Sequence, residues 1–227
     1  MTNTYENRTE IETVKASART VDFWFDPLCP WAWIASRWLL EAKKVRNLDV
    51  RWHVMSLAIL NQGRDLSDDY TSLMEKTWGP VRVVVAAREQ YGDDVVLPLY
   101  TALGNRFHRE DASADRETVE AALKEVDLPL ELAGAMTSDE YDSQLEASHR
   151  DGMERVGMDV GTPVISVEGV SFFGPVVSPI PTGEAAGRLW DGVLLVAGTD
   201  GFFELKRTRD RPPIFNLETG ETVSARL

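Results

Sequence analysis

The order of strand-like and helical segments along the sequence predicts an α/β fold with a helical insertion. A strand, a helix and a second strand span 21–57, and a long stretch without convincing strands spans 66–157. Two short strands and a final helix span 163–197. The first three elements call for a right-handed parallel crossover. The two later strands are close enough for a tight hairpin, so the core is expected to combine parallel and antiparallel pairing.

The first unit rests on a change in the spacing of its apolar residues. Val21–Phe25 is dominated by aromatic and β-branched residues, which predicts a short buried strand. From Trp31 to Arg46 apolar residues recur three or four apart, as on one face of a helix. Asp49–Leu57 begins with apolar residues alternating with Arg and His, which predicts the second strand.

The middle of the chain is expected to be helical, with breaks or starts at prolines and glycines. The predicted segments are Asp68–Tyr91, Val95–Phe107, Ala114–Val126, Pro129–Met136 and Ser138–Val156. Strands over Pro163–Val167 and Val170–Phe173 follow, joined by the two residues Glu168-Gly169, and Thr182 is expected to cap a helix that ends at Ala197. The predicted domains are therefore an extension (1–18), a core (19–64 and 158–206), a helical insertion (65–157) and a tail without clear periodicity (207–227).

Composition and charge exclude several function classes. The net charge is −13 and is spread along the chain, which argues against binding nucleic acid or an anionic membrane surface. No apolar run approaches the length of a membrane-spanning helix, and the polar start lacks the apolar core of a secretory signal. A single cysteine is poor support for an oxidising compartment. The sequence therefore predicts a cytoplasmic protein that acts on small molecules.

The strongest chemical signal is Cys29, which lies where the first strand gives way to a helix. The N-terminal end of a helix favours a thiolate, so the pKa of this thiol is expected to fall. Pro30 suits the first helical position, and Trp31 can form an apolar lip for a flat substrate. Far along the chain, Thr162-Pro163 precedes a strand, where a cis peptide would turn backbone groups toward the thiol. The alternatives are a buried packing cysteine and a trans proline that only opens the strand.

These residues carry a resemblance to a known family. The segments "FWFDPLCPWAWIASRWLLE", "YTALGNRFH", "VGTPVIS" and "FFGPVVSPIPTGEAAGRLWDG" resemble the DsbA-like branch of the thioredoxin superfamily. The resemblance is closer still to the actinobacterial mycothiol-dependent nitroreductase family. It implies a thioredoxin fold with a helical lid, frequent homodimers, and redox chemistry with a low-molecular-weight thiol. In it, Cys29 corresponds to the nucleophilic cysteine and Pro163 to the cis-proline.

The chain departs from that family at one position of the motif. Members commonly have "CPWC", whereas this chain has "CPWA", with Ala32 in place of the resolving cysteine. A monothiol route remains open, in which mycothiol or another external thiol is the co-substrate and no cofactor is bound tightly. A thiol-dependent cis–trans isomerase or transferase acting on a conjugated molecule also needs one sulfur only. A non-catalytic binding protein is the third alternative.

Several polar residues are candidates for supporting roles. His108, at the end of a predicted insertion helix, is a candidate acid–base partner because histidine titrates near neutral pH. Asn61 and Tyr70 follow the second strand, where their side chains can hydrogen-bond a carbonyl or nitro group, although a capped loop, with Asp65 or Ser67 starting the next helix, is the favoured explanation. His149 is expected at the surface. With one cysteine and three scattered histidines, no metal site is expected.

Overall fold

The computed structural model describes residues 17–65, 67–216 and 222–224, and its centre is a four-stranded mixed sheet. The strand order is β2-β1-β3-β4. Strand β1 pairs in parallel with β2 and antiparallel with β3, and β3 pairs antiparallel with β4. The strands are β1 Arg19–Phe25, β2 Leu48–Val54, β3 Val164–Val167 and β4 Val170–Phe173. The predicted combination of parallel and antiparallel pairing is confirmed.

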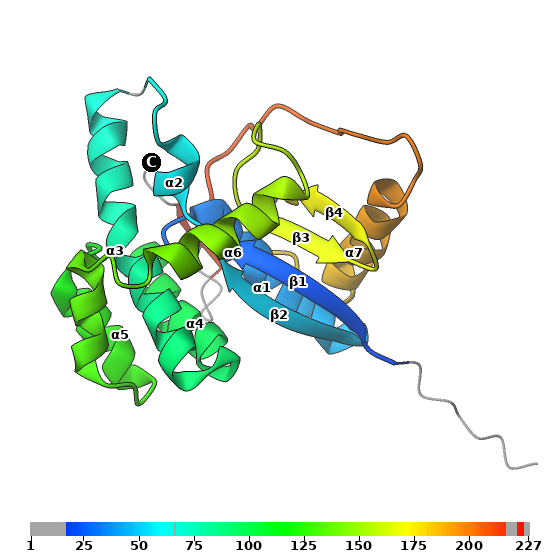
Figure 1. The fold of residues 1–227 in the computed structure, drawn as a ribbon. Helices are drawn as coiled ribbons and strands as arrows, with labels where there is room; N and C mark the ends of the chain where they lie inside the picture. The colour runs from blue at the N-terminus through cyan, green and yellow to red at the C-terminus, as the bar shows by residue number, and fades with distance from the viewer. Residues whose placement is uncertain (1–16, 66, 217–221, 225–227) are drawn as a thin grey trace, which may run out of the picture.

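Helices cover both faces of this sheet. Helix α6 crosses one face, in contact with β2 and β3, while α1 and α7 pack together on the opposite face (Figure 1). Helices α2 to α6 all come between β2 and β3 in the chain. The helices are α1 Pro30–Val45, α2 Leu57–Asn61, α3 Asp68–Tyr91, α4 Val96–His108, α5 Arg116–Glu125, α6 Asp142–Glu154 and α7 Gly183–Ala197, with 3₁₀ turns η1 Asp93–Val95 and η2 Leu130–Thr137.

The continuous apolar run of β1 is explained by burial on both faces. Side chains alternate across a strand, so Phe23 and Phe25 pack with α1 while Trp24 packs against Met153 of α6. All three aromatic side chains are almost completely excluded from water. Strand β1 ends at Phe25, and the chain then turns into the loop that carries Cys29.

Three elements differ from the expectation. The segment expected as a helix over 129–136 is a 3₁₀ helix, η2, and the last insertion helix starts only at Asp142. The tail, expected to lack regular structure, contains β5 (Ile214–Asn216) paired antiparallel with β6 (Thr222–Ser224). Strands of three residues carry too little periodicity to be recognised in a sequence.

The hairpin between β3 and β4 is confirmed, together with the reason for its sequence. Glu168 and Gly169 have φ angles of 51° and 83°, so both central residues lie in the left-handed region. A type I′ turn requires this conformation at both positions, and glycine adopts it without strain. The turn fixes the register in which Val167 pairs with Val170.

Helix α4 depends on a glycine at its contact with α1. A Cβ atom at Gly104 would lie 2.1 Å from Cζ3 of Trp33, which is fully buried. We expect Gly104→Ala to lower the free energy of unfolding by about 2 kcal/mol, because a well-packed core resists added volume. Urea unfolding measures this effect. Gly192→Ala in α7, where a Cβ has open space, is the matched control and is expected to stay within about 1 kcal/mol of the unsubstituted chain. Equal losses in the two variants would contradict the prediction.

Candidate active site at Cys29

The thiol of Cys29 lies between the first turn of α1 and the segment that leads into β3. Cys29 is the N-cap residue of α1, and its Sγ accepts a hydrogen bond from the backbone N–H of Ala32 at 3.4 Å. The same sulfur donates to the backbone carbonyl of Thr162 at 3.5 Å. Pro30 occupies the first turn, where its missing N–H leaves no intrahelical bond unmade. The sequence therefore places the thiol correctly, at a helix start beside Thr162.

The segment carrying Thr162 and Pro163 is fixed to the strands on either side. The peptide bond between the two residues is cis. The Thr162 hydroxyl donates to the carbonyl of Trp24 in β1 at 3.3 Å, and the Pro163 carbonyl accepts from the N–H of Gly174 at 2.9 Å. Because β1 and β3 are neighbours, residues 133 positions apart in the sequence meet at one end of the sheet.

Burial controls the protonation state of the thiol. Cys29 is only 6% exposed, and loss of hydration raises its pKa to about 12. The backbone N–H groups of Ala32 and Trp31 act in the opposite direction, while the nearby charge of Asp26 raises the pKa further. The expectation of a lowered pKa was therefore wrong. It considered the helix N-terminus alone, whereas burial depends on packing that local sequence does not reveal.

Asp26 is a buried carboxylate that the sequence analysis did not identify as part of the site. Its side chain is completely excluded from water and accepts hydrogen bonds from the N–H groups of Leu28 at 2.9 Å and Leu57 at 2.8 Å. Burial nevertheless dominates and raises its pKa to about 7. An acidic residue directly after an apolar strand and three positions before a cysteine was the available signal. The carboxyl group links the Cys29 loop to the start of α2.

His108 supports the same loop from the other side. Its Nε2 lies 2.8 Å from the carbonyl oxygen of Pro27, which can only accept, so this nitrogen carries the proton. Burial lowers the pKa of His108 to about 4, which keeps the ring neutral at physiological pH. The ring centroid lies 5.6 Å from those of Trp33 and Phe215. This histidine positions the Cys29 loop, and its part in acid–base chemistry stays a prediction.

The other predicted site residues lie on three different helices, α1, α2 and α3. Trp31, in the first turn of α1, is half-buried. Asn61 ends α2, where its side-chain amide donates to the carbonyl of Leu57 at 2.8 Å and faces Met74 of α3. Asn61 and Trp78 line a cavity of about 240 Å³ between these two helices. Tyr70 belongs to α3, but its side chain lies outside the described residues.

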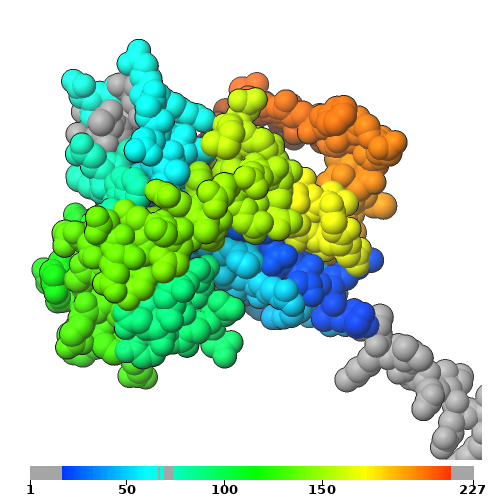
Figure 2. Space-filling model, viewed as in Figure 1, coloured from blue at the N-terminus to red at the C-terminus, as the bar shows by residue number. Residues whose placement is uncertain are grey.

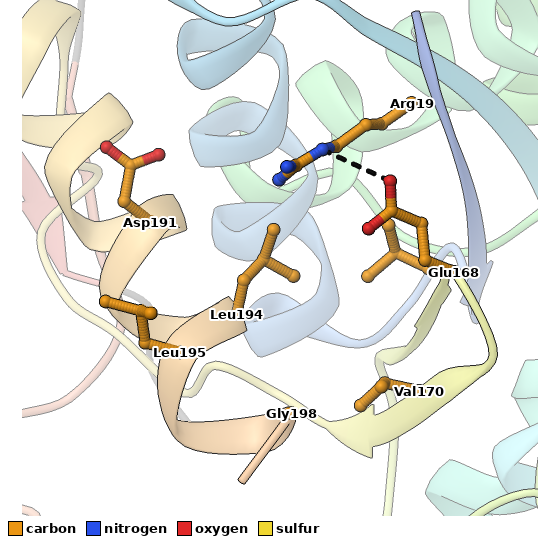
Figure 3. A pocket seen from close by; sticks show the side chains of 8 residues that line it. Arg19, Glu168, Val170, Asp191, Leu194, Leu195 and Gly198 are labelled. Carbon is orange, nitrogen blue, oxygen red and sulfur yellow. Dashed lines mark ion pairs between the residues drawn. The ribbon is translucent and has the colours of Figure 1, made fainter.

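A larger surface cavity, of about 360 Å³, lies at the opposite end of the sheet. It is lined by Arg19 at the start of β1, by Glu168 in the β3–β4 turn, and by Leu194 and Asp191 of α7 (Figure 3). Arg19 and Glu168 form an ion pair of 3.2 Å across its wall. Cys29 follows the other end of β1, so this cavity is separate from the thiol.

His149 corrects a further expectation, because it is buried instead of lying at the surface. Its Nδ1 accepts from the N–H of Ser56 at 3.2 Å, and it is 4% exposed. Burial lowers the pKa of His149 to about 4, so the ring is neutral at physiological pH. His149 therefore fixes the start of α2, next to the loop that Asp26 holds.

Within residues 17–65, 67–216 and 222–224, no group of three or more His, Cys, Asp or Glu side chains is arranged to hold a metal ion. No helix within those same ranges has both the length and the apolar character to cross a membrane.

Comparison with known proteins gives consistent matches. Residues 28–207 match the model of the Rv2466c-like family, described as mycothiol-dependent nitroreductase Rv2466c. The uncharacterized protein Rv2286c of Mycobacterium tuberculosis is 27% identical over 196 residues, which cover 84% of this chain and 82% of that protein.

Two solved structures share the fold at low sequence identity. A probable DsbA oxidoreductase, SCO1869 from Streptomyces coelicolor, has a TM-score of 0.55 at 13% identity, covering 89% of this chain and 97% of that chain. A 2-hydroxychromene-2-carboxylate isomerase has a TM-score of 0.54 at 16% identity, covering 78% and 93%. These likenesses confirm the predicted DsbA-like thioredoxin fold.

Proposed function

The chain belongs to the Rv2466c-like family of mycothiol-dependent nitroreductases, and on that premise we propose that this thiol-dependent oxidoreductase works with Cys29 as its only protein sulfur. A dissociable low-molecular-weight thiol, mycothiol or a similar compound, supplies the second sulfur. The observation that carries the proposal is Ala32. Its N–H donates to the Cys29 sulfur from the position where family members commonly have a resolving cysteine, and Cys29 is the only cysteine in the chain.

The proposed cycle balances with two external thiols. A small electrophile takes up two electrons and two protons, while the sulfur of Cys29 forms a disulfide bond with the first thiol. A second external thiolate then attacks the mixed disulfide, forms a disulfide with the first thiol and returns Cys29 as a thiolate. The net oxidation is of two thiols to one disulfide, so no second protein sulfur and no tightly bound cofactor are needed.

The resting thiol must lose a proton before it can react. Its pKa of about 12 keeps it protonated, with the S–H directed at the Thr162 carbonyl. Asp26, with a pKa of about 7, is the buried carboxylate that we propose as the acceptor of this proton, although its own charge raises the pKa of the thiol. An incoming thiol compound that pairs with the backbone of Thr162 and Pro163 would displace this hydrogen bond and free the sulfur. Trp31, Asn61 and Tyr70 are the side chains proposed to contact the electrophile.

The proposed setting is the cytoplasm, where a reduced pool of small thiols resolves mixed disulfides. The proposed partners are a small-molecule substrate and the thiol. A homodimer remains a prediction from the family resemblance.

The test is intact-protein mass spectrometry after incubation with the disulfide forms of mycothiol and glutathione. We expect one adduct per chain with mycothiol disulfide, at Cys29, and its rapid removal by excess mycothiol. Cys29→Ser should form no adduct under the same conditions. An unmodified Cys29 under both disulfides would contradict the proposed redox cycle.

A second candidate function is thiol-dependent cis–trans isomerisation, and the absence of a sulfur at position 32 favours it as well. Addition of one thiolate to a conjugated double bond, rotation about the resulting single bond and elimination need no second cysteine. The likeness to 2-hydroxychromene-2-carboxylate isomerase supports the fold alone. If the protein accelerates the thiol-dependent interconversion of a conjugated acid without forming a mixed disulfide, this alternative replaces the redox cycle.

A further inference from the structure

The C-terminal segment contacts two residues around the candidate active site, Trp31 and His108. Beyond α7, residues 198–212 are exposed and run as an arch that stands away from the body of the protein, with an opening beneath it (Figure 2). The family match ends at residue 207, within this arch.

The far end of the arch is firmly anchored. The N–H of Ile214 donates to the hydroxyl of Ser178 at 2.9 Å, and this hydroxyl donates to the carbonyl of Pro212 at 3.1 Å. Phe215 is completely buried in the main core, with its ring beside that of His108. Because His108 also holds the carbonyl of Pro27, the anchor reaches the loop that positions Cys29.

Within the arch, shortly before the anchor, Arg209 lies over Trp31 of the candidate active site. Its guanidinium carbon is 5.4 Å from the ring centroid of Trp31. Among the described residues Arg209 forms no ion pair with a carboxylate, whereas Arg211 in the same segment pairs with Asp210 at 2.9 Å. Trp31 also contributes one of the backbone N–H groups that act on the Cys29 thiol. A positive charge that pairs with no carboxylate among the described residues is thus placed over the ring of Trp31, two residues from Cys29 in the chain.

We propose that residues 209–216 form a wall of the active site and that Arg209 makes the site favour anionic reagents over neutral ones. Phe215 holds the wall in place, and Arg209 supplies its charge over Trp31. The substrate class that fits is a small electrophile or thiol compound carrying a carboxylate or another anionic group. The inference rests on the proposed function only in taking Cys29 as the reacting group.

The test compares two alkylating reagents of similar size and different charge. In each reaction the Cys29 thiolate displaces iodide, from anionic iodoacetate or from neutral iodoacetamide, and intact mass measures the rate. We expect Arg209→Gln to lower the ratio of the iodoacetate rate to the iodoacetamide rate about threefold, as for loss of one partly solvated charge near the reagent. Arg207→Gln, two residues away in the same exposed arch, is the matched control and should keep the original ratio. An unchanged ratio in Arg209→Gln would overturn the proposal.

A second variant tests the wall itself. Phe215→Ala removes the anchor, so both alkylation rates should rise severalfold while their ratio falls to the Arg209→Gln value. A circular dichroism spectrum checks that the variant is folded. If Cys29 stays unreactive in folded Phe215→Ala, the segment does not screen the thiol and the proposal is wrong. The reagents contain no mycothiol, so a failure of the proposed redox cycle would show in the adduct experiment and not in this ratio.

Discussion

Replacing Ala32 with cysteine is expected to shorten the lifetime of a mixed disulfide on Cys29 by at least about a hundredfold. The comparison is with the lifetime of the same disulfide in the unsubstituted chain in millimolar external thiol. The reason is proximity, because a sulfur held in the same helical turn reacts as though it were at a very high effective concentration. Its backbone N–H already contacts the Cys29 sulfur at 3.4 Å, so the added side chain starts within that turn. Ala32 is fully buried, and one extra sulfur is expected to destabilise the core by about 1–3 kcal/mol.

In the measurement, reaction with dithiodipyridine converts Cys29 to a mixed disulfide with thiopyridine. Intact mass then follows this adduct over time. The unsubstituted chain should keep the thiopyridine adduct until external thiol is added. Ala32→Cys should lose it spontaneously and end as an intramolecular disulfide. Ala35→Cys is the matched control, a buried position about one turn further along the same helix, where the added sulfur lies farther from Cys29. Equal adduct lifetimes in the unsubstituted chain and in Ala32→Cys would show that position 32 does not face the bound disulfide.

The same result would show what the absence of a sulfur at position 32 does in this chain. Without a second sulfur, the release of a mixed disulfide depends on the supply of small thiol, so the thiol concentration sets the turnover. The predicted hundredfold difference is a measure of that dependence. A dithiol enzyme would release its adduct regardless of the thiol supply.

Sequence patterns predicted the long helices with regular apolar spacing and the turns with a characteristic length and residue type. Helix α3 has the predicted bounds, Asp68–Tyr91, because 24 residues of helical spacing leave little ambiguity. The β3–β4 hairpin was predicted because Glu168-Gly169 leaves two residues for the turn. The strands of the tail were missed, since pairing between two three-residue segments depends on contacts that no local pattern records.

Local signals predicted the position of Cys29 at a helix start, whereas properties that depend on burial were missed. Thr162 was expected beside the thiol of Cys29, and the structure contains a hydrogen bond from this thiol to the Thr162 carbonyl. Asp26 was overlooked, because its role depends on the N–H of Leu57, which a second strand brings to it. The direction of the Cys29 pKa was wrong for the same reason, since exclusion from water follows from the whole fold. Arg209 was also missed, because its contact with Trp31 joins residues from opposite ends of the chain.

The burial of Asp26 makes the stability of the protein depend on pH. Its pKa rises from 3.8 to about 7 on folding, so the folded protein binds a proton that the unfolded chain releases. Stability therefore falls as the pH rises between these two values, and the loss is complete above the folded pKa. We expect Asp26→Asn, which cannot ionise, to gain about 3 kcal/mol over the unsubstituted chain between about pH 5 and pH 8.

A pH-independent loss is superimposed on this gain. The carboxylate accepts one N–H on each oxygen, from Leu28 and from Leu57, and the amide nitrogen of asparagine cannot accept. One hydrogen bond is therefore lost, which costs about 1–2 kcal/mol at every pH. The diagnostic quantity is accordingly the difference in unfolding free energy between the two proteins as a function of pH, measured by urea unfolding.

Asp115→Asn separates this effect from the removal of any carboxylate. Asp115 is exposed and caps α5 by accepting from the N–H of Thr118, which lowers its pKa. It is ionised in both states above about pH 5, and asparagine is an equally good cap, so its curve should run parallel to that of the unsubstituted chain. A parallel curve for Asp26→Asn as well would mean that Asp26 is already ionised in the folded protein. Burial would then not hold its proton, and Asp26 would be charged throughout the range in which the thiol of Cys29 must react.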